Sequence, residues 1–92
     1  MENLDALVRS TMRHMHFPFD THDFIIKLAH HNQREYVRLL YEADSDTPFQ
    51  KLHGQIGKRL KALAEEFGLV GVEASSPDIF RQHNSCVEWS ER

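Results

Sequence analysis

The chain has 92 residues, of which 40% are hydrophobic and 27% charged, and its net charge is -3. A chain of this length can build one hydrophobic core, so we expect a single domain over residues 1–92. This composition excludes disordered and fibrous proteins, and no apolar stretch is long enough to span a membrane. The single cysteine, Cys86, cannot form an internal disulfide, and with no signal-peptide pattern the sequence predicts a cytoplasmic protein.

Two helices are predicted in the N-terminal third. Apolar residues at spacings of three and four indicate a helix over about 4–15. The segment around Pro18 interrupts it, because proline cannot donate a backbone hydrogen bond and disfavours helical geometry in the residue before it. Asp20 then opens a second helix over 21–31.

A third helix is predicted over 33–43. Asn32 and Glu35 have the spacing of a capping box, which indicates that the chain restarts a helix there after a turn. The acidic run from Glu42 to Asp46 has no apolar periodicity and is expected to form a solvated loop.

The clearest local signal is a helix over 48–67. Thr47 stands at the N-cap, Pro48 at the first helical position, and Gln50 where it closes a capping box. Gly68 follows as a left-handed C-cap. The apolar side chains form one narrow stripe without a change of phase, which predicts a continuous helix. Its members are Phe49, Leu52, Ile56, Leu60, Leu63 and Phe67.

Two glycines lie on the flank of that stripe. Gly54 and Gly57 each weaken a helix, so they mark either a break or the close approach of a neighbouring backbone. The two alternatives differ in function. A break near Gly54 favours a helix-turn-helix, whereas an unbroken rod favours a plain helical interaction domain.

The C-terminal quarter predicts a β-hairpin. Short β-prone runs at about 69–74 and 86–90 form its strands, and a long connection joins them. Within that connection Ser76-Pro77-Asp78 resembles a cap and first helical turn that directs Ile79 and Phe80 inward. The expected fold class is therefore mainly α with a small C-terminal β-hairpin packed on the helices.

Histidine and cysteine do not predict a metal site or an enzyme. One histidine cluster has enough members to supply three ligands, but it lacks the short, fixed ligand spacings of small zinc domains. It comprises His14, His16, His22, His30 and His31. Cys86 and His83 could form a thiolate pair, yet the surrounding sequence lacks the patterns of cysteine hydrolases. We therefore expect no catalysis, metal or cofactor.

The polar face of the long helix is the candidate binding surface. Lys51, Gln55 and Lys58 lie opposite the apolar stripe, with Arg59 and Lys61 on its two shoulders. Long hydrogen-bond donors on one face suit a helix that reads a groove of DNA. They are also common on any exposed helix, because lysine and arginine are good helix formers.

The segment from Ile56 to Val70, with the hairpin after it, resembles the third helix and wing of winged helix-turn-helix domains. Such domains commonly end this helix in a leucine, a short acidic step and Gly-Leu-Val. The resemblance covers about residues 33–90 and implies a winged-helix-like domain whose helix and wing tip contact nucleic acid. The residues it assigns to that contact, together with Lys51, are Gln55, Lys58, Arg59, Lys61, Arg81 and His83.

The first functional expectation is a transcriptional regulator that binds double-stranded DNA, as a homodimer because one module with few basic contacts holds DNA weakly. The alternative is a protein-interaction module, an adaptor or inhibitor. It would present the N-terminal helix or the acidic loop Glu42–Asp46 to a protein partner, and the net negative charge motivates it.

Overall fold

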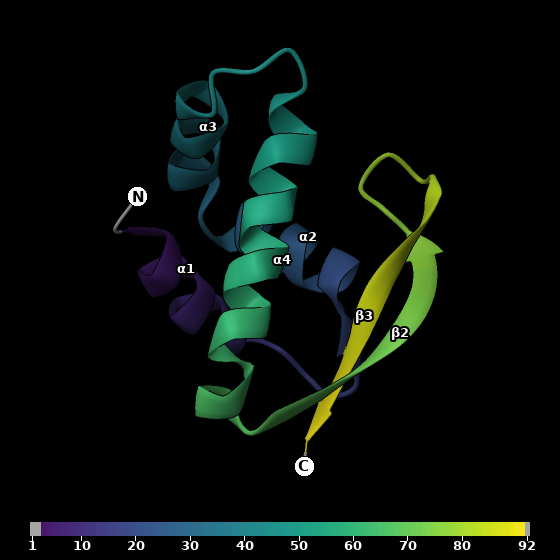
Figure 1. Ribbon diagram of the computed structural model, residues 1–92. Helices are drawn as coiled ribbons and strands as arrows, with labels where there is room; N and C mark the ends of the chain where they lie inside the picture. Colours follow the sequence, from purple (N-terminus) through teal and green to yellow (C-terminus); the bar gives the residue numbers. More distant parts are fainter. Residues whose placement is uncertain (1–2, 92) are drawn as a thin grey trace.

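The computed structural model describes residues 3–91, which form four helices and a three-stranded antiparallel sheet. The helices are α1 (Asn3–Met12), α2 (Thr21–His31), α3 (Gln33–Glu42) and α4 (Pro48–Phe67). The strands are β1 (Phe19–Asp20), β2 (Leu69–Pro77) and β3 (His83–Glu91), in the sheet order β1-β3-β2. In Figure 1, α4 runs through the middle, with α1 and α3 on one side and the hairpin of β2 and β3 on the other.

The predicted bounds are confirmed for α2 and α4, and α3 ends one residue earlier than expected. The first helix ends at Met12 rather than at residue 15. Beyond it the chain tightens into bonds three residues apart, from the amides of His14 and Met15 to the carbonyls of Thr11 and Met12. The 4–15 prediction was therefore too long by one tight turn.

The structure places the capping box elsewhere than the sequence pattern did. Neither Asn32 nor Thr47 caps the following helix with its side chain, so both predicted capping boxes were wrong. The Asn32 amide instead donates to the carbonyl of Leu28 and completes the end of α2. The box is formed by Asp20 and Asp23, in which each carboxylate accepts from the other residue's backbone amide.

The hairpin is longer than predicted and its tip is shorter. The strand pairing runs from Leu69 opposite Glu91 to Pro77 opposite His83. Both predicted strands, 69–74 and 86–90, therefore continue further toward the hairpin tip than expected. The helical turn expected at Ser76–Asp78 was wrong. Ser76 pairs with Asn84 across the ladder, because a continued antiparallel register satisfies the backbone groups that an isolated helical turn leaves unpaired.

No sequence pattern predicted β1, so the predicted lone hairpin becomes a three-stranded sheet and the domain is mixed α/β. Phe19 lies opposite Trp89 and Asp20 opposite Glu88. A strand of two residues is too short for an alternating pattern to be recognised. Gly71 lies opposite Trp89 on the other side, where an added Cβ would be 2.8 Å from the ring.

The core lies between α4, the other helices and the inner face of the sheet. The predicted stripe of α4 is confirmed, since Leu52, Ile56 and Leu60 are fully buried. Phe24 and Leu28 of α2 meet this stripe, and Trp89 closes it from the sheet. Among residues 3–91 no helix combines the length and the apolar character that a membrane crossing requires.

Candidate nucleic-acid interface

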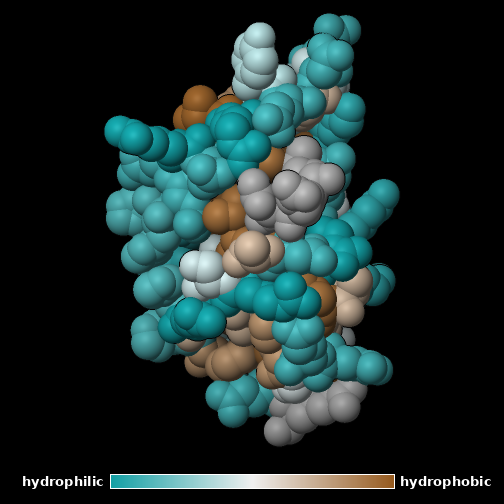
Figure 2. All heavy atoms as spheres, turned by 90° about the vertical axis from the view of Figure 1, so that its left-hand side faces the viewer, coloured by the Kyte–Doolittle hydropathy of each residue, from teal (hydrophilic) through white to brown (hydrophobic). Residues whose placement is uncertain are grey.

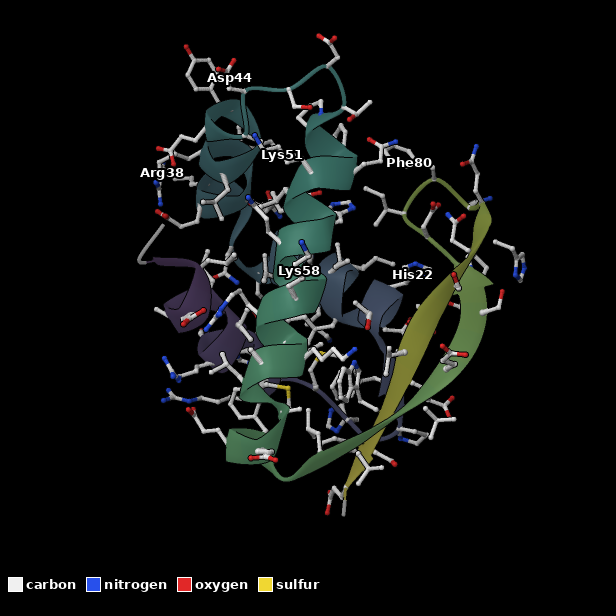
Figure 3. All side chains as sticks on the ribbon, in the orientation of Figure 1. His22, Arg38, Asp44, Lys51, Lys58 and Phe80 are labelled. Atoms are coloured by element: carbon white, nitrogen blue, oxygen red, sulfur yellow. The ribbon has the colours of Figure 1, made fainter. Side chains whose placement is uncertain are left out.

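The solvent-facing side of α4 carries basic residues and, from Pro48 to Ala64, no acidic one. Lys51, Lys58 and Lys61 are exposed on it. In Figure 3 the side chain of Lys58 lies on the face of α4 that is turned toward the viewer, where no other helix covers it. This side of the helix therefore combines positive charge with access from solvent.

Two of the basic side chains assigned to this surface form polar contacts with other parts of the domain. Arg59 and Asp5 of α1 form a bidentate ion pair, with Nε 2.6 Å from Oδ1 and Nη2 2.9 Å from Oδ2. Hydrogen bonding in this pair raises the pKa of Arg59 and lowers the pKa of Asp5. Lys51 Nζ donates to the carbonyl of Ala43 at the end of α3, 2.7 Å away.

Lys58 and Lys61 make no ion pair within residues 3–91, which leaves them as the available cations at the centre of α4. Gln55 is half-buried, and its Oε1 is buried without a hydrogen-bond partner among the described residues. It is therefore less accessible than the helical projection suggested. Of the five polar residues assigned to α4, the structure leaves two lysines fully available and ties two cations to neighbouring helices.

Arg81 and His83 are exposed at the hairpin tip. Asp78 builds this tip: its Oδ1 accepts from the amides of Phe80 and Gln82 at 2.8 and 3.0 Å. The hydrogen bond from Gln82 contributes most to holding the pKa of Asp78 below its usual range. Arg81 has a φ of 65°, so its side chain projects from a left-handed turn.

A cleft of about 540 Å³ separates α4 from the hairpin. Gly54 and Gly57 lie along its α4 side: an added Cβ would meet no atom within 4 Å at Gly54, and only Thr21 at 3.7 Å at Gly57. The glycines therefore mark neither a break nor a close backbone contact, but leave the cleft open. At its rim the rings of Phe49 and Phe80 pack edge to face with centroids 5.2 Å apart. In Figure 3 Phe80 lies on the hairpin side, level with the first turns of α4.

The cleft also contains a histidine that the sequence analysis did not single out. His53 Nε2 lies 2.5 Å from the hydroxyl of Tyr36 on α3. Burial lowers the pKa of His53 and raises that of Tyr36, so both groups are held neutral near neutral pH. Only the packing of α3 against α4 brings the two side chains together.

The histidine cluster considered for a metal is divided by the fold. His14 stacks on His31 with ring centroids 4.6 Å apart, and His30 contacts His31 edge-on. Desolvation, followed by the charge of His14, lowers the pKa of His31. His22 lies elsewhere, between α4 and the hairpin in Figure 3, with Nδ1 2.7 Å from the hydroxyl of Ser76.

Cys86 faces a different histidine from the one suggested by sequence proximity. Its Sγ lies 3.5 Å from the hydroxyl of Ser76, which also contacts His22. His83, three residues away, is exposed at the end of β3. The register of the hairpin and the position of α2 decide this pairing, and neither can be read from local sequence.

Comparison with known proteins leaves the family of this chain open. No family model matches it, and no solved structure gives a significant match. A stretch of 54 residues is 33% identical to 4-hydroxy-3-methylbut-2-enyl diphosphate reductase of Bacillus subtilis (strain 168). The stretch covers 59% of this chain but 17% of the reductase. The chain is thus similar to a small part of that enzyme.

Proposed function

We propose that this domain binds double-stranded DNA through the exposed face of α4, with the hairpin tip as a second contact. The observation that carries the proposal is the exposed side of α4, which has no acidic residue from Pro48 to Ala64 and on which Lys58 and Lys61 make no ion pair within the described residues. The first acidic residue on this side is the exposed Glu65, one helical turn beyond Lys61. Arg81 adds a further exposed cation at the tip. A basic helix beside a β-hairpin is the arrangement that the winged-helix resemblance implies.

The continuity of α4 restricts the form of this proposal. α4 is unbroken from Pro48 to Phe67, which excludes a turn at Gly54 and, by the criterion set from the sequence, favours the interaction domain described below as the second candidate. DNA binding by a helix-turn-helix therefore requires that α3 and α4, joined by residues 43–47, form the motif. With about three cations at the surface a single copy binds weakly, so a cytoplasmic homodimer is part of the proposal.

The test is a titration of fluorescently labelled duplex DNA at 50 and 200 mM salt. Three phosphate contacts predict that log affinity falls with log salt with a slope of about -2.7, or about 40-fold between the two conditions. No binding at 50 mM salt would contradict the proposal.

The variant that locates the surface is Lys58→Glu with Lys61→Glu. We expect a loss of affinity of at least about 100-fold at 50 mM salt, because both phosphate contacts become repulsive. Arg59 is kept, since its replacement would break the ion pair with Asp5. The matched control is Arg13→Glu with Arg34→Glu, which changes the net charge equally at exposed positions outside α4. An equal loss in both double variants would show a nonspecific charge effect.

A second candidate function rests on the outer side of α3. Val37 and Tyr41, one helical turn apart, are 63% and 88% exposed. They precede the acidic segment 42–46, which supports contact with a protein partner of basic and apolar character. Figure 2 shows the side formed by α1 and α3, where hydrophobic patches are separated by a larger hydrophilic surface.

The two candidates respond to different variants. Val37→Ser with Tyr41→Ser should abolish capture of a protein partner from the source cell and leave DNA binding unchanged. Lys58→Glu with Lys61→Glu should have the opposite effects. A partner retained by the α3 variant would contradict the interaction proposal.

A further inference from the structure

Three side chains of different metal-binding chemistry converge beside the cleft. Asp20 ends β1 and caps α2, His22 lies in the first turn of α2, and Cys86 lies on β3. One potential ligand atom from each lies within 4.8 Å of the other two. All three residues are half-buried, and His22 and Cys86 line the cleft.

Each member of the group retains an atom for a ligand. Asp20 Oδ1 accepts from the amide of Asp23, whereas Oδ2 makes no hydrogen bond within residues 3–91. His22 Nδ1 is 2.7 Å from the Ser76 hydroxyl, and Nε2 has no hydrogen-bond partner within the same range. The Cys86 thiol is not part of a disulfide, and its sulfur has a loose 3.5 Å contact to Ser76.

We propose that Asp20, His22 and Cys86 bind one zinc ion. Thiolate and imidazole ligands bind zinc in preference to magnesium or calcium, which take oxygen ligands. The thiolate and the carboxylate together carry two negative charges, which balance the charge of Zn²⁺. On binding, the Cys86 thiol releases its proton to solvent as the Zn–S bond forms.

The geometry requires only a small contraction. Tetrahedral zinc with bonds of about 2.0–2.3 Å places its ligand atoms about 3.3–3.7 Å apart. Since one potential ligand atom of each residue lies within 4.8 Å of the other two, those three atoms need to approach one another by at most about 1.5 Å. Ser76 then supports the imidazole from the second shell when Nε2 binds the metal, because its hydroxyl can accept from Nδ1–H.

Three protein ligands leave a fourth position, and because His22 and Cys86 line the cleft, water or a ligand in the cleft can take it. The ion would also join α2 to β3 across the sheet, since two ligands come from residues 20–22 and one from the hairpin. Zinc would thus fix the hairpin relative to α2. This site is independent of DNA binding.

The direct test is titration of the metal-free full chain with Zn²⁺ against a chromophoric chelator, followed by Co²⁺ as a spectroscopic probe. We expect one ion per chain, a charge-transfer band between thiolate and Co²⁺, and a melting temperature that rises with Zn²⁺ concentration. Absence of binding at micromolar Zn²⁺ would overturn the proposal.

Variants identify the ligands. Cys86→Ser should remove the charge-transfer band, and His22→Gln and Asp20→Asn should each weaken Zn²⁺ binding at least tenfold. Asp20→Asn retains a good N-cap residue, so a loss of affinity there reports the carboxylate rather than the helix. If Cys86→Ser does not fold, Cys86→Ala keeps a small apolar side chain for the same measurement.

The controls are His83→Gln, on the same hairpin, and His14→Gln with His31→Gln, at the stacked pair. Both should bind Zn²⁺ as the unaltered chain does. Unchanged binding in both Cys86 variants, or loss of binding in either control, would place the metal elsewhere and overturn the assignment.

Discussion

The two flanks of α4 use the same kind of side chain in opposite ways. Toward α1, Arg59 is held by Asp5, and a second ion pair joins Arg9 to Glu66 at 2.7 Å. Toward the hairpin, Lys61 lines an open cleft and has no ion pair within the described residues. The charges on the α1 flank are thus neutralised by ion pairs, whereas on the hairpin flank the charge of Lys61 and the space of the cleft remain accessible to a ligand.

The comparison shows why a helical projection assigns binding residues poorly. Arg59 and Lys61 lie on the two shoulders of the same stripe and carry equal charge. One contributes to the packing of α1, and the other is available to a ligand. The difference depends on which element lies beside each shoulder.

The largest expected effect comes from adding a side chain at Gly71, where the backbone of β2 packs closely against Trp89. Gly71→Ala brings a Cβ within 2.7 Å of Val87 and 2.8 Å of Trp89, a distance that requires one of them to move. Trp89 is buried, so we expect a loss of about 1–3 kcal/mol in the free energy of unfolding. Urea denaturation measures it, and a loss below about 0.5 kcal/mol would show that the hairpin shifts freely.

Gly54→Ala tests whether the hairpin flank is open, and the expected effect is smaller and of opposite sign. Nothing lies within 4 Å of the added Cβ, and alanine favours the helix. The free energy of unfolding should rise by about 0.5–1 kcal/mol in the same urea assay. A decrease would mean that another element occupies the space beside Gly54.

The next prediction concerns pH and His53, which lines the cleft. Because burial lowers its pKa in the folded state, the unfolded chain takes up the proton first as pH falls below about 6.5. The stability contributed by neutral His53 is therefore present above that pH and is lost as pH falls through the lowered folded-state pKa. Nearby His22 adds to this lowering, and Asp78 opposes it.

His53→Gln should reduce the dependence of unfolding free energy on pH between about 7 and 5. His31 retains its own contribution in this variant, because its pKa is lowered in the same direction. Thermal unfolding at several pH values gives the slopes. An unchanged slope would show that His53 is as easily protonated in the folded chain as in the unfolded one.

The smallest effect is expected on the α1 flank. Arg59→Gln removes an ion pair that is partly exposed to solvent, so the loss of stability should be slight and should shrink in high salt. A double-mutant cycle with Asp5→Asn isolates the pair. Lys58→Gln is the matched control and should leave stability unchanged, since Lys58 has no ion pair within residues 3–91.

Local sequence was sufficient for the elements whose signals are local. Periodicity gave α4 and its buried stripe, and the left-handed C-cap at Gly68 is present with a φ of 68°. The helix over 21–31 was also predictable. Caps were less reliable, because the side chains at the predicted N-caps bond elsewhere: the Asn32 amide donates to the carbonyl of Leu28, and the Thr47 hydroxyl lies 3.5 Å from that of Ser45.

Sequence by itself determined where the helices form, how α4 is oriented by its apolar stripe and that the C-terminus is extended. Tertiary structure decided the rest, because it depends on residues far apart in the chain. The pairing of Phe19 with Trp89, the capture of Arg59 by Asp5 and the meeting of His22 with Cys86 each join segments more than 50 residues apart. No local pattern encodes such contacts, so the available cations of α4 and the proposed zinc ligands emerge only from the packed chain.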